Sequence, residues 1–523
     1  MRAELRDTLE QLFPDSTISP KPVRSLCLDV GRGGTAAVNL LLTGLHAGDK
    51  VRLAASGIAG VQWFRLVDVP VEENTGLHAF TEGHGDSTEP NPYVIRRAPF
   101  RVYDALEPVA AEVRAAGPVL ALRLHASIPL QAKPGPRPIV IHVGCAAGEQ
   151  ELKLDLRIHA ARIPPPGPKS LPYTNWFSFT LMAERHGLQA WSEAHWRMIR
   201  HYADLMVHGR QNMFWFTWSD VFRRTPHGLV LNRERLRRIV RTFSDAGMHW
   251  IEGGHVAGRS GGAWNAKTFD VALGGPGATS PAGNADLATA LRQLREEIDA
   301  NGWRERWIQH VTDEPIAENA ADYRILVGMV RKYLPGIPLV DATMDTSLVG
   351  SVDIWCPKAH DYQQHREALE AQRAVGDRVW FYTCCDPGGP WLNRLMDMEL
   401  LRPALFGWGA ALFRLDGFLH WGLNHYRADQ NPFERSVVGH EGEGHLPAGD
   451  THVVYPGTTG PWSSVRFEAQ REGFEDYELL RRLQARAPRQ AAAVIRRAFR
   501  AFDDYTKDVK VFRAARRKLL ECV

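Results

Sequence analysis

Two different hydrophobic patterns divide the chain near residue 168. Before it, short segments alternate apolar and polar positions, which is the period of a half-buried strand. The predicted strands cover residues 25–29, 51–55, 119–125, 139–143 and 152–159. Residues 104–116 have a helical pattern and interrupt this series. Several short strands separated by glycine- and proline-rich turns predict a β-sandwich for residues 1–168.

The pattern changes after residues 163–168, where four prolines in six positions cannot continue a sheet ladder. Strands then alternate with helices. Apolar segments predict eight strands at residues 176–181, 212–216, 248–253, 307–313, 338–342, 352–356, 379–383 and 417–421. Helical periodicity predicts helices at residues 192–207, 233–245, 285–300, 320–333, 362–374, 394–405 and 464–484. Such alternation predicts a (β/α)8 barrel.

The patterns together predict a multidomain chain. We expect an N-terminal β-sandwich accessory domain at residues 1–168, a (β/α)8 TIM barrel catalytic domain at 169–485, and a C-terminal helical segment at 486–523. A doubly wound open sheet is the alternative, but no G-x-G-x-x-G turn follows the first strand.

Composition narrows the functional classes. Among 523 residues, 63 Lys and Arg face 60 acids, and a net charge of +3 gives no nucleic-acid footprint. No apolar run is long enough to span a membrane, and the charged N-terminus lacks a signal-peptide pattern, so we expect a cytoplasmic protein. The six cysteines show no C-x-x-C spacing and predict neither a disulfide framework nor a metal site. The basic C-terminal residues, interspersed with acids, predict a solvated helix face.

Tryptophan is distributed unevenly. Of sixteen tryptophans, only Trp63 precedes residue 170. In a barrel, the functional residues lie at the carboxyl ends of the strands. Acids, aromatics and hydrogen-bonding side chains gather there: Trp215, Glu252, His255, Asp313, Glu314, Asp341, Trp355, Tyr382, Asp386, Trp421 and Asn424, with Asn393 and Arg394 in the loop after the seventh strand. Aromatic rings stack on sugar rings and carboxylates protonate glycosidic oxygens, so this set favours a carbohydrate substrate.

The adjacent acids Asp313 and Glu314 are the most informative pair. They follow an apolar strand, and Pro315 ends the ladder just past them. Where a strand breaks into a loop, both side chains can turn toward one site, and crowding or burial would raise one carboxyl pKa. A helix N-cap is the alternative, because acids followed by proline also begin helices.

Several motifs resemble the catalytic domain of glycoside hydrolase family 123 and its uncharacterised bacterial relatives. The resemblance covers about residues 170–485. Its motifs are residues 380–394, 417–424, 447–450, 454–457, 466–469 and 473–480. An N-terminal sandwich before the barrel also fits that family.

The resemblance implies a retaining β-N-acetylgalactosaminidase, or a related 2-acetamido-hexosaminidase, that uses substrate-assisted catalysis. Glu314 would be the general acid/base, and Asp313 would orient the substrate's 2-acetamido group, whose carbonyl oxygen attacks the anomeric carbon. Tyr382 is a candidate for holding that oxygen. Candidates for contacting the sugar are Trp421, Trp355, Trp215, Glu252, His255, Asn393, Arg394 and Asn424. We expect an oligosaccharide or glycoconjugate substrate and no cofactor.

Three other functions stay open at this stage. A glycosidase for sugars without an acetamido group would pair Glu314 with a second carboxylate, from Glu252, Asp341 or Asp386. A metal-dependent hydrolase would draw on His255, His310 and His360, which lack the usual ligand spacing. A catalytically inactive relative would bind carbohydrate without turnover.

Overall fold

The computed structural model describes residues 1–84, 87–343, 345–440 and 444–523. Two compact units divide the chain. The first unit comprises residues 1–165, 385–413 and 424–523, and the second unit comprises residues 166–384 and 414–423. The chain first crosses between the units beside the proline-rich segment. Most of the C-terminal part returns to the first unit, so the segments predicted at 169–485 and 486–523 do not coincide with the units.

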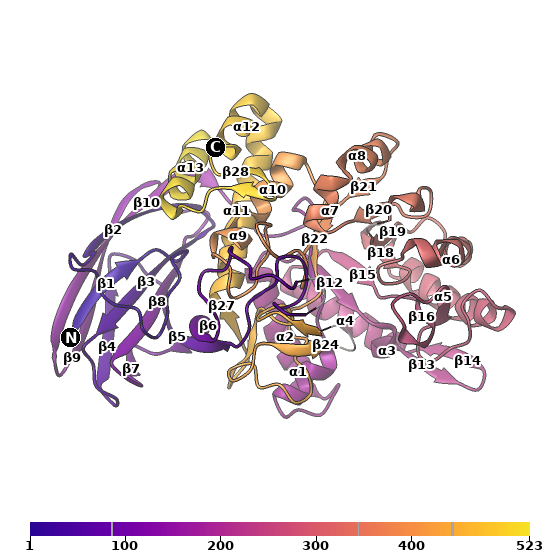
Figure 1. Ribbon diagram of the computed structural model, residues 1–523, viewed down its shortest axis with the longest axis horizontal. Coiled ribbons are helices and arrows are strands. Elements are labelled where there is room, and N and C mark those ends of the chain that lie inside the picture. Colours follow the sequence, from indigo (N-terminus) through magenta and orange to yellow (C-terminus); the bar gives the residue numbers. More distant parts are fainter. Residues whose placement is uncertain (85–86, 344, 441–443) are drawn as a thin grey trace. The chain divides into compact units, whose positions relative to one another are not determined.

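Two sheets build most of the first unit (Figure 1). One sheet has the order β1 (Arg2–Arg6), β3 (Thr35–Thr43), β8 (Val119–Ser127), β5 (Val61–Val71), β6 (Phe100–Val109), β27 (Pro461–Ser464), β26 (Tyr455–Pro456). The other has the order β2 (Ser25–Arg32), β10 (Gly148–Arg162), β9 (Gly135–Cys145), β4 (Lys50–Ser56), β7 (Glu112–Arg114). Buried side chains of both sheets, such as Leu40, Leu122, Ile141 and Leu154, form one core. This arrangement is consistent with the predicted β-sandwich.

The helix predicted at residues 104–116 is wrong. Those residues form the end of β6 and all of β7, and β6 pairs with β5 from Phe100 to Val109. The segment is rich in alanine and glutamate, which favour helices, but burial between neighbouring strands outweighs that local preference.

Helices from the C-terminal part complete the first unit. They are α9 (Leu401–Ala404), α10 (Phe406–Phe413), α11 (Val465–Arg486), α12 (Pro488–Ile495) and α13 (Val509–Cys522). A Cβ at Gly407 would lie 2.0 Å from the carbonyl oxygen of Gly473, so only glycine allows α10 and α11 to pack this closely. Asp476 on α11 accepts a hydrogen bond of 3.1 Å from Trp408 Nε1 on α10. These contacts explain part of the motif at 473–480.

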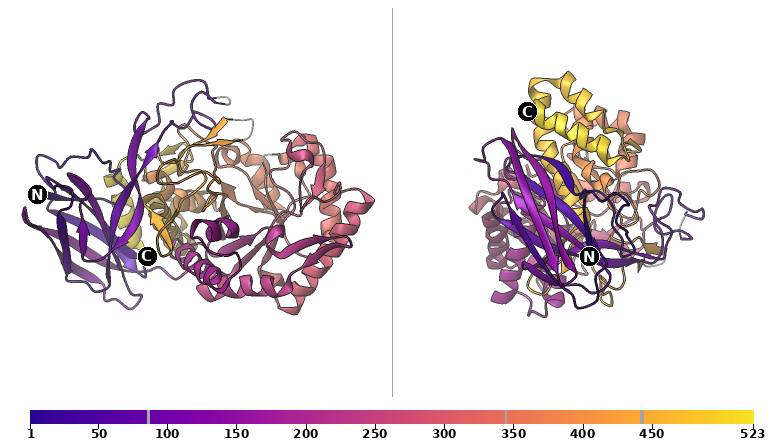
Figure 2. Two further views of the ribbon diagram at one scale, coloured as in Figure 1. Left: turned by 90° about the horizontal axis from the view of Figure 1, so that it is seen from below. Right: turned by 90° about the vertical axis from the view of Figure 1, so that its left-hand side faces the viewer.

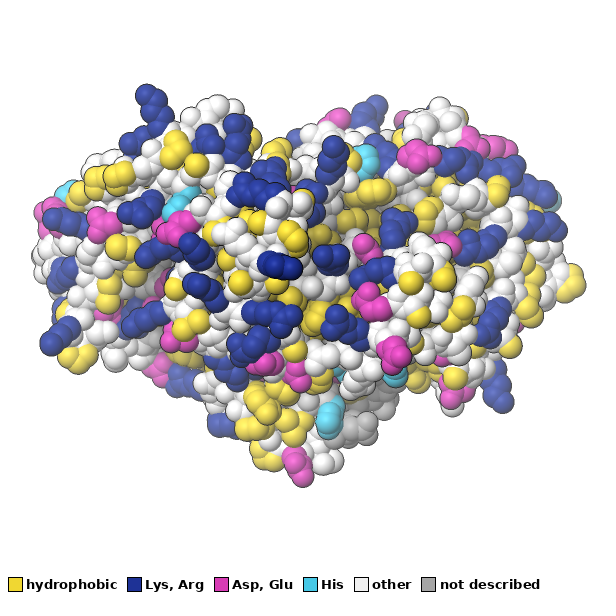
Figure 3. Space-filling model, turned by 90° about the horizontal axis from the view of Figure 1, so that it is seen from above, with side chains coloured by type: hydrophobic (Ala, Val, Ile, Leu, Met, Phe, Trp, Pro, Cys, Tyr) yellow, Lys and Arg dark blue, Asp and Glu magenta, His cyan; other side chains and the backbone are white. Residues whose placement is uncertain are grey.

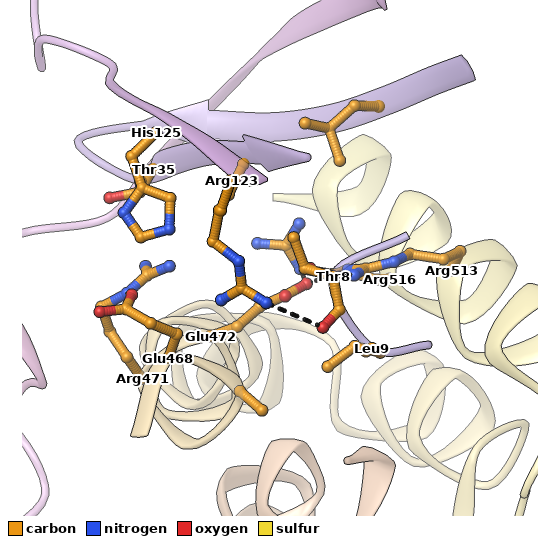
Figure 4. Close-up of a pocket in the computed structure, with 13 residues that line it drawn as sticks. Thr8, Leu9, Thr35, Arg123, His125, Glu468, Arg471, Glu472, Arg513 and Arg516 are labelled. Carbon is orange, nitrogen blue, oxygen red and sulfur yellow. Dashed lines mark hydrogen bonds and ion pairs between the residues drawn. The ribbon is translucent and has the colours of Figure 1, made fainter. Parts of the chain in front are cut away.

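A buried ionic network joins α11 and α13 to the strands of the first unit. Arg516 Nε lies 2.9 Å from Asp476, and Arg513 pairs with Asp7 at 2.6 Å. Arg123 points into the small cavity between these helices and the sheet (Figure 4), where burial lowers its pKa to about 10. The solvated face predicted for the C-terminal helix is therefore wrong at Arg516, which is only 4% exposed. Its ion pairs come from residues far away in sequence.

Parallel strands form the centre of the second unit. One sheet has the order β12 (Met213–Phe216), β15 (Trp250–Gly253), β18 (Trp307–His310), β19 (Leu339–Ala342), β20 (Ile354–Cys356), β21 (Arg378–Val379). The other has the order β11 (Tyr173–Asn175), β23 (Phe418–His420), β22 (Phe381–Tyr382). Trp380 separates β21 from β22, which are successive parts of one extended segment. Hydrogen bonds between Tyr173 and Asn212 link the start of β11 to that of β12.

Helices lie on the outside of these strands, as Figure 2 shows from below. The longer ones are α2 (Glu193–His208), α4 (Arg233–Ala246), α5 (Pro281–Ala300) and α6 (Ala320–Tyr333), with shorter α1 (Phe179–Arg185), α3 (Trp218–Val221), α7 (Ala359–Gln364) and α8 (Arg366–Ala374). Ser192, Asn232 and Ser280 cap α2, α4 and α5 through their side-chain oxygens. Short hairpins interrupt the alternation at β13 (Phe222–Thr225) with β14 (Gly228–Leu231), and at β16 (Ala257–Arg259) with β17 (Phe269–Val271).

Two predicted elements of the Trp-rich part differ from those observed. No strand forms at 176–181. The observed strand β11 ends at Asn175, and α1 begins after Ser178, which accepts a hydrogen bond from Leu181 N. The helix predicted at 394–405 begins only at Leu401. Asp397, within that range, accepts two hydrogen bonds of 2.7 Å from Thr75 of the first unit, which holds the preceding residues in a non-helical conformation.

The surface has charges of both signs. On the face drawn in Figure 3, Lys and Arg side chains spread widely, with acids and small hydrophobic areas between them. Among the described residues, no helix has the length and apolar character needed to cross a lipid bilayer.

Candidate active site

Side chains from the parallel strands of the second unit form a common core. It includes Trp176, Met213, Trp215, Ile308, Val340, Ile354, Cys356, Trp380, Tyr382 and Leu419, with Trp421 packed against it and partly exposed. Asp313 and Glu314 come just after the carboxyl end of β18, and Tyr382 ends β22. The predicted strand ends therefore do bring polar groups to one side of this core.

The backbone at Glu314 is strained. Its φ is +45°, a left-handed conformation that costs a non-glycine residue about 1 kcal/mol. Arg259, at the end of β16, donates a hydrogen bond of 2.6 Å from its Nη2 to the carbonyl oxygen of Glu314. The acids precede Asn319 and helix α6 by several residues, and Ile316 N binds the Asn319 side chain. Neither acid therefore caps the helix, which removes that alternative.

Both carboxyl groups have raised pKa values. Desolvation, and then the charge of Asp313, raise the pKa of Glu314 to about 7. Desolvation also raises the pKa of Asp313, against the positive charges of Arg259 and His310. Asp313 is nevertheless exposed to solvent and Glu314 partly so. Protein surrounds these carboxyls on most sides while solvent, or a substrate, reaches them from one.

Two side chains favour the ionised form of Glu314. The Tyr382 hydroxyl donates a hydrogen bond to Glu314 Oε1. Lys358, which follows β20 and pairs with Tyr382 through a parallel bridge, opposes the raised pKa by its positive charge. Glu314 can thus be protonated near neutrality and still be stabilised when it loses its proton, as a group that alternates between acid and base requires.

A buried histidine links two further acids beneath the site. His310 Nε2 lies 2.8 Å from Glu252 Oε1, and His310 Nδ1 lies 3.1 Å from Asp341 Oδ1. All three side chains are fully buried. Burial would lower the pKa of His310, but its hydrogen bonds to Asp341 and Glu252 outweigh this effect and raise the pKa to about 9. His310 is therefore a buried cation held between two carboxylates.

Hydrogen bonds from Asp341 and Glu252 hold the surrounding backbone and side chains. Asp341 accepts from the backbone N–H groups of Val311 and Thr312, at 3.1 and 3.4 Å, and from the Tyr323 hydroxyl. Glu252 accepts from Thr174 and from Trp176 Nε1, at 2.6 and 2.8 Å. Asp341 thereby fixes the two residues that lead into Asp313 and Glu314.

This network disagrees with two expectations. Glu252 was predicted to contact the sugar, and both Glu252 and Asp341 were considered as the second carboxylate. Both side chains are buried and already accept several hydrogen bonds. Removing either from its donors would leave the buried cation at His310 with only one of its two carboxylate partners.

Among the residues that the structure describes, two groups of side chains have spacings that suit a metal ion. His255, His310 and Asp341 lie close enough in the second unit. Because His310 donates from both ring nitrogens, it offers no lone pair to a metal. In the first unit, the partly exposed Glu73, His84 and His445 form the other group, and Glu73 already accepts a hydrogen bond of 2.8 Å from His445.

The predicted aromatic contacts divide into two kinds. Trp421 follows β23, is partly exposed, and packs against the common core. Trp215 stacks on Trp176 with ring centroids 4.3 Å apart, and its buried Nε1 has no hydrogen-bond partner among the described residues. The sugar contact predicted for Trp355 is wrong. Strand alternation turns this side chain away from the common core, and its indole donates to Asp377 at 2.8 Å.

His255 is partly exposed and packs edge-on against Trp176, Trp215 and His310. Burial, and the charge of His310, lower the pKa of His255 to about 3, so the ring is neutral. Its Nε2 has no hydrogen-bond partner among the described residues and can bind a water or a hydroxyl group.

Asn393, Arg394 and Asn424 belong to the first unit and are fully buried there. Asn393 donates to the carbonyl oxygen of Pro387 at 3.0 Å, Arg394 donates to Gln470 at 3.1 Å, and Asn424 pairs with His452 through a backbone bridge. These contacts give the three residues structural roles in the first unit, unlike the sugar contacts predicted for them.

Sequence reasoning missed Lys358 and Arg259. Lys358 lies two residues after β20, so the strand-end rule could have found it. The prediction selected acids and aromatics at the strand ends and omitted this lysine. Arg259 lies on a hairpin inserted after β15, which the strand–helix pattern does not reveal.

The chain is similar to known proteins in part of its sequence and in its fold. Residues 267–483 match the model of the glycoside hydrolase 123 catalytic domain. A family 123 glycoside hydrolase from Clostridium perfringens, studied for glycolipid glycan hydrolysis, has a similar fold with a TM-score of 0.72 at 13% identity, over 99% of this chain and 96% of that chain. β-Glucuronidase 3 from Bacteroides uniformis matches with a TM-score of 0.33 at 11% identity, over 86% of this chain and 51% of that one. No curated protein matches the sequence.

The paired acids beside an aromatic core and the matched domain define a glycoside hydrolase, whose substrate is a carbohydrate or glycoconjugate. The domain at residues 267–483 is similar to the catalytic domain of glycoside hydrolase family 123. The family resemblance inferred from the sequence motifs is confirmed.

Proposed function

We propose that the protein is a retaining β-N-acetylgalactosaminidase, or a related 2-acetamido-hexosaminidase, that uses the substrate's own acetamido group as nucleophile. One observation carries this proposal. The charge of Asp313 acts on Glu314 and helps to raise its pKa, whereas Glu252 and Asp341 are held in the buried network around His310. Those two carboxylates are engaged, and Asp386, the third candidate, belongs to the first unit. We therefore favour a nucleophile supplied by the sugar.

In the first step, the protonated carboxyl of Glu314 gives its proton to the glycosidic oxygen, and the bond from that oxygen to the anomeric carbon breaks. The carbonyl oxygen of the 2-acetamido group attacks the anomeric carbon and forms a cyclic oxazolinium ion. Asp313, ionised, accepts the acetamido N–H and stabilises the positive charge that develops there. Holding the nucleophile within the substrate supplies much of the acceleration.

In the second step, the carboxylate of Glu314 takes a proton from water, and the water oxygen attacks the anomeric carbon from the side that the leaving group occupied. The oxazolinium ring opens, which gives the acetamido sugar with its original anomeric configuration. Lys358 and the Tyr382 hydroxyl favour the ionised Glu314 that this step needs. In this proposal, the same hydroxyl turns toward the acetamido oxygen when substrate is bound.

We also interpret the second unit as the core of a (β/α)8 barrel. The strand order β12-β15-β18-β19-β20-β21 and β22-β23-β11, all parallel, supports this interpretation. The hydrogen bonds between Tyr173 and Asn212 join the two ends of this series.

Hydrolysis of an aryl N-acetyl-β-galactosaminide beside the plain aryl β-galactoside tests the proposal. We expect turnover of the first and little of the second, and inhibition by the thiazoline that mimics the cyclic intermediate. Equal rates on the two substrates, without thiazoline inhibition, would instead support a glycosidase with a second carboxylate. Binding of the sugar without turnover would indicate an inactive relative.

A further inference from the structure

The hairpin of β16 and β17 presents an exposed tryptophan next to the catalytic pair. Trp264, between the two strands, is 45% exposed. All sixteen tryptophans lie within the described ranges, and the other fifteen are buried or only partly exposed. An indole with nearly half of its surface in water offers an apolar face on which a sugar ring can stack.

Arg259 connects this indole to the general acid. Its guanidinium carbon lies 4.1 Å from the centroid of the Trp264 ring, and its Nη2 donates the 2.6 Å hydrogen bond to the carbonyl oxygen of Glu314. A single guanidinium group therefore separates the indole from the backbone of Glu314. The cation–π contact orients the ring while nearly half of the side chain stays open to solvent.

The hairpin is held by hydrogen bonds and is not a loose loop. Ser260 donates to Asp270 at 2.8 Å across the hairpin. Asn319, just before α6, donates to the carbonyl oxygen of Ala266 at 3.2 Å, and Phe269 N donates to Asp322 on α6 at 3.0 Å. Trp264 thus has a defined position relative to the segment that carries Glu314.

We propose that Trp264 and Arg259 form a binding site for the sugar ring on the leaving-group side of the scissile bond. This inference rests on the proposed role of Glu314. Glu314 protonates the leaving oxygen, so groups attached to its backbone on that side meet the departing saccharide. The indole face stacks on the apolar face of a hexose ring, and the guanidinium offers donors to its hydroxyl groups. The enzyme then prefers a glycan over a simple aglycone as leaving group.

The test compares two substrates of the same acetamido sugar. One is a disaccharide of N-acetylgalactosamine β-linked to galactose, which fills the leaving side with a ring. The other is N-acetyl-β-galactosaminyl fluoride, whose small leaving group makes no contact with Trp264. For Trp264→Ala we expect kcat/KM on the disaccharide to fall about tenfold to a hundredfold, mainly through KM, since stacking also binds the ground state. The fluoride should react at nearly the wild-type rate.

Trp264→Phe keeps an aromatic face and should retain most of the disaccharide activity. Lys267→Ala, an exposed change on the same hairpin, is the matched control and should affect neither substrate. An equal loss on both substrates, or no loss on either, would overturn the inference while leaving the proposed function intact. A wild-type enzyme that hydrolyses neither substrate would overturn the proposed function itself.

Discussion

Replacing Tyr382 by phenylalanine should move the alkaline limb of the pH–rate profile to higher pH. The wild-type limb reports the loss of the Glu314 proton, because the acid form must protonate the leaving oxygen. With the pKa of Glu314 at about 7, kcat/KM should fall about tenfold for each pH unit above that value. The Tyr382 hydroxyl donates to the carboxylate and so favours its ionised form. Its removal therefore raises the pKa of Glu314.

The size of the shift follows from the hydrogen bond. A hydrogen bond to a charged group contributes about 1.5–3 kcal/mol, and about 1.4 kcal/mol corresponds to one pKa unit. Water entering the vacated space recovers part of this energy, so we expect the limb to move up by about one pH unit. The plateau should fall as well, because the hydroxyl also contacts the substrate in the proposed mechanism.

Profiles of kcat/KM between pH 5 and 9, each normalised to its own plateau, separate the two effects. Tyr202→Phe is the matched control, since it removes another buried hydroxyl of the second unit, one paired with His186 at 3.2 Å. Its limb should coincide with that of the wild type. A Tyr382→Phe limb that is unchanged or moves to lower pH would refute the assignment of Glu314 as the titrating acid.

Four further predictions follow from particular contacts. Glu314→Gln should lower kcat on the disaccharide by about 100-fold to 10,000-fold while thermal unfolding stays near wild type, and wild-type rates in that variant would contradict its role. Asp341→Asn should lower kcat by about 100-fold with little change in KM, through displacement of the catalytic pair, and His310 should titrate at lower pH in NMR spectra because Asp341 helps to raise its pKa. Arg466→Leu leaves the buried Asp104 without its positively charged partner and should cost about 3–5 kcal/mol of unfolding free energy in urea titrations; a loss below 1 kcal/mol would contradict this. Dialysis against a chelator should leave kcat/KM unchanged, because His310 has no nitrogen lone pair for a metal, and a loss restored by zinc would refute that reasoning.

Much of the strand pattern was predictable from the sequence because it is local. The segments at 212–216 and 338–342 are short, apolar and bounded by turns, and the structure has strands there. The misassigned segment at 104–116 shows where this fails. Its composition favours a helix, and only the pairing of β6 with β5 decides for a strand.

The candidate site was predictable where one segment carries it. Asp313 and Glu314 are adjacent and stand before a proline, and the expected raised pKa is found at both. The role of Glu252 was not predictable, because its hydrogen bonds come from Thr174 and Trp176 at β11 and from His310 on β18, segments far from it in sequence. From the sequence, a buried structural acid and a sugar-binding acid at a strand end look the same.

Trp355 illustrates a further limit. It lies in the middle of β20, between Ile354 and Cys356, which face the core, and the phase of the alternation along β20 turns it toward Asp377. A strand of three residues is too short for its phase to be inferred from the sequence.

The central claim, an acetamido nucleophile activated beside Asp313 and Glu314, is tested most directly by changing the nucleophile itself. The measurement is kcat/KM for aryl β-galactosaminides whose N-acyl group is acetyl, monofluoroacetyl, difluoroacetyl or trifluoroacetyl. Each fluorine withdraws electrons from the carbonyl oxygen, so substrate assistance predicts a steep fall in rate along the series. Nearly equal rates across the four substrates would contradict the account and assign the nucleophile to the protein.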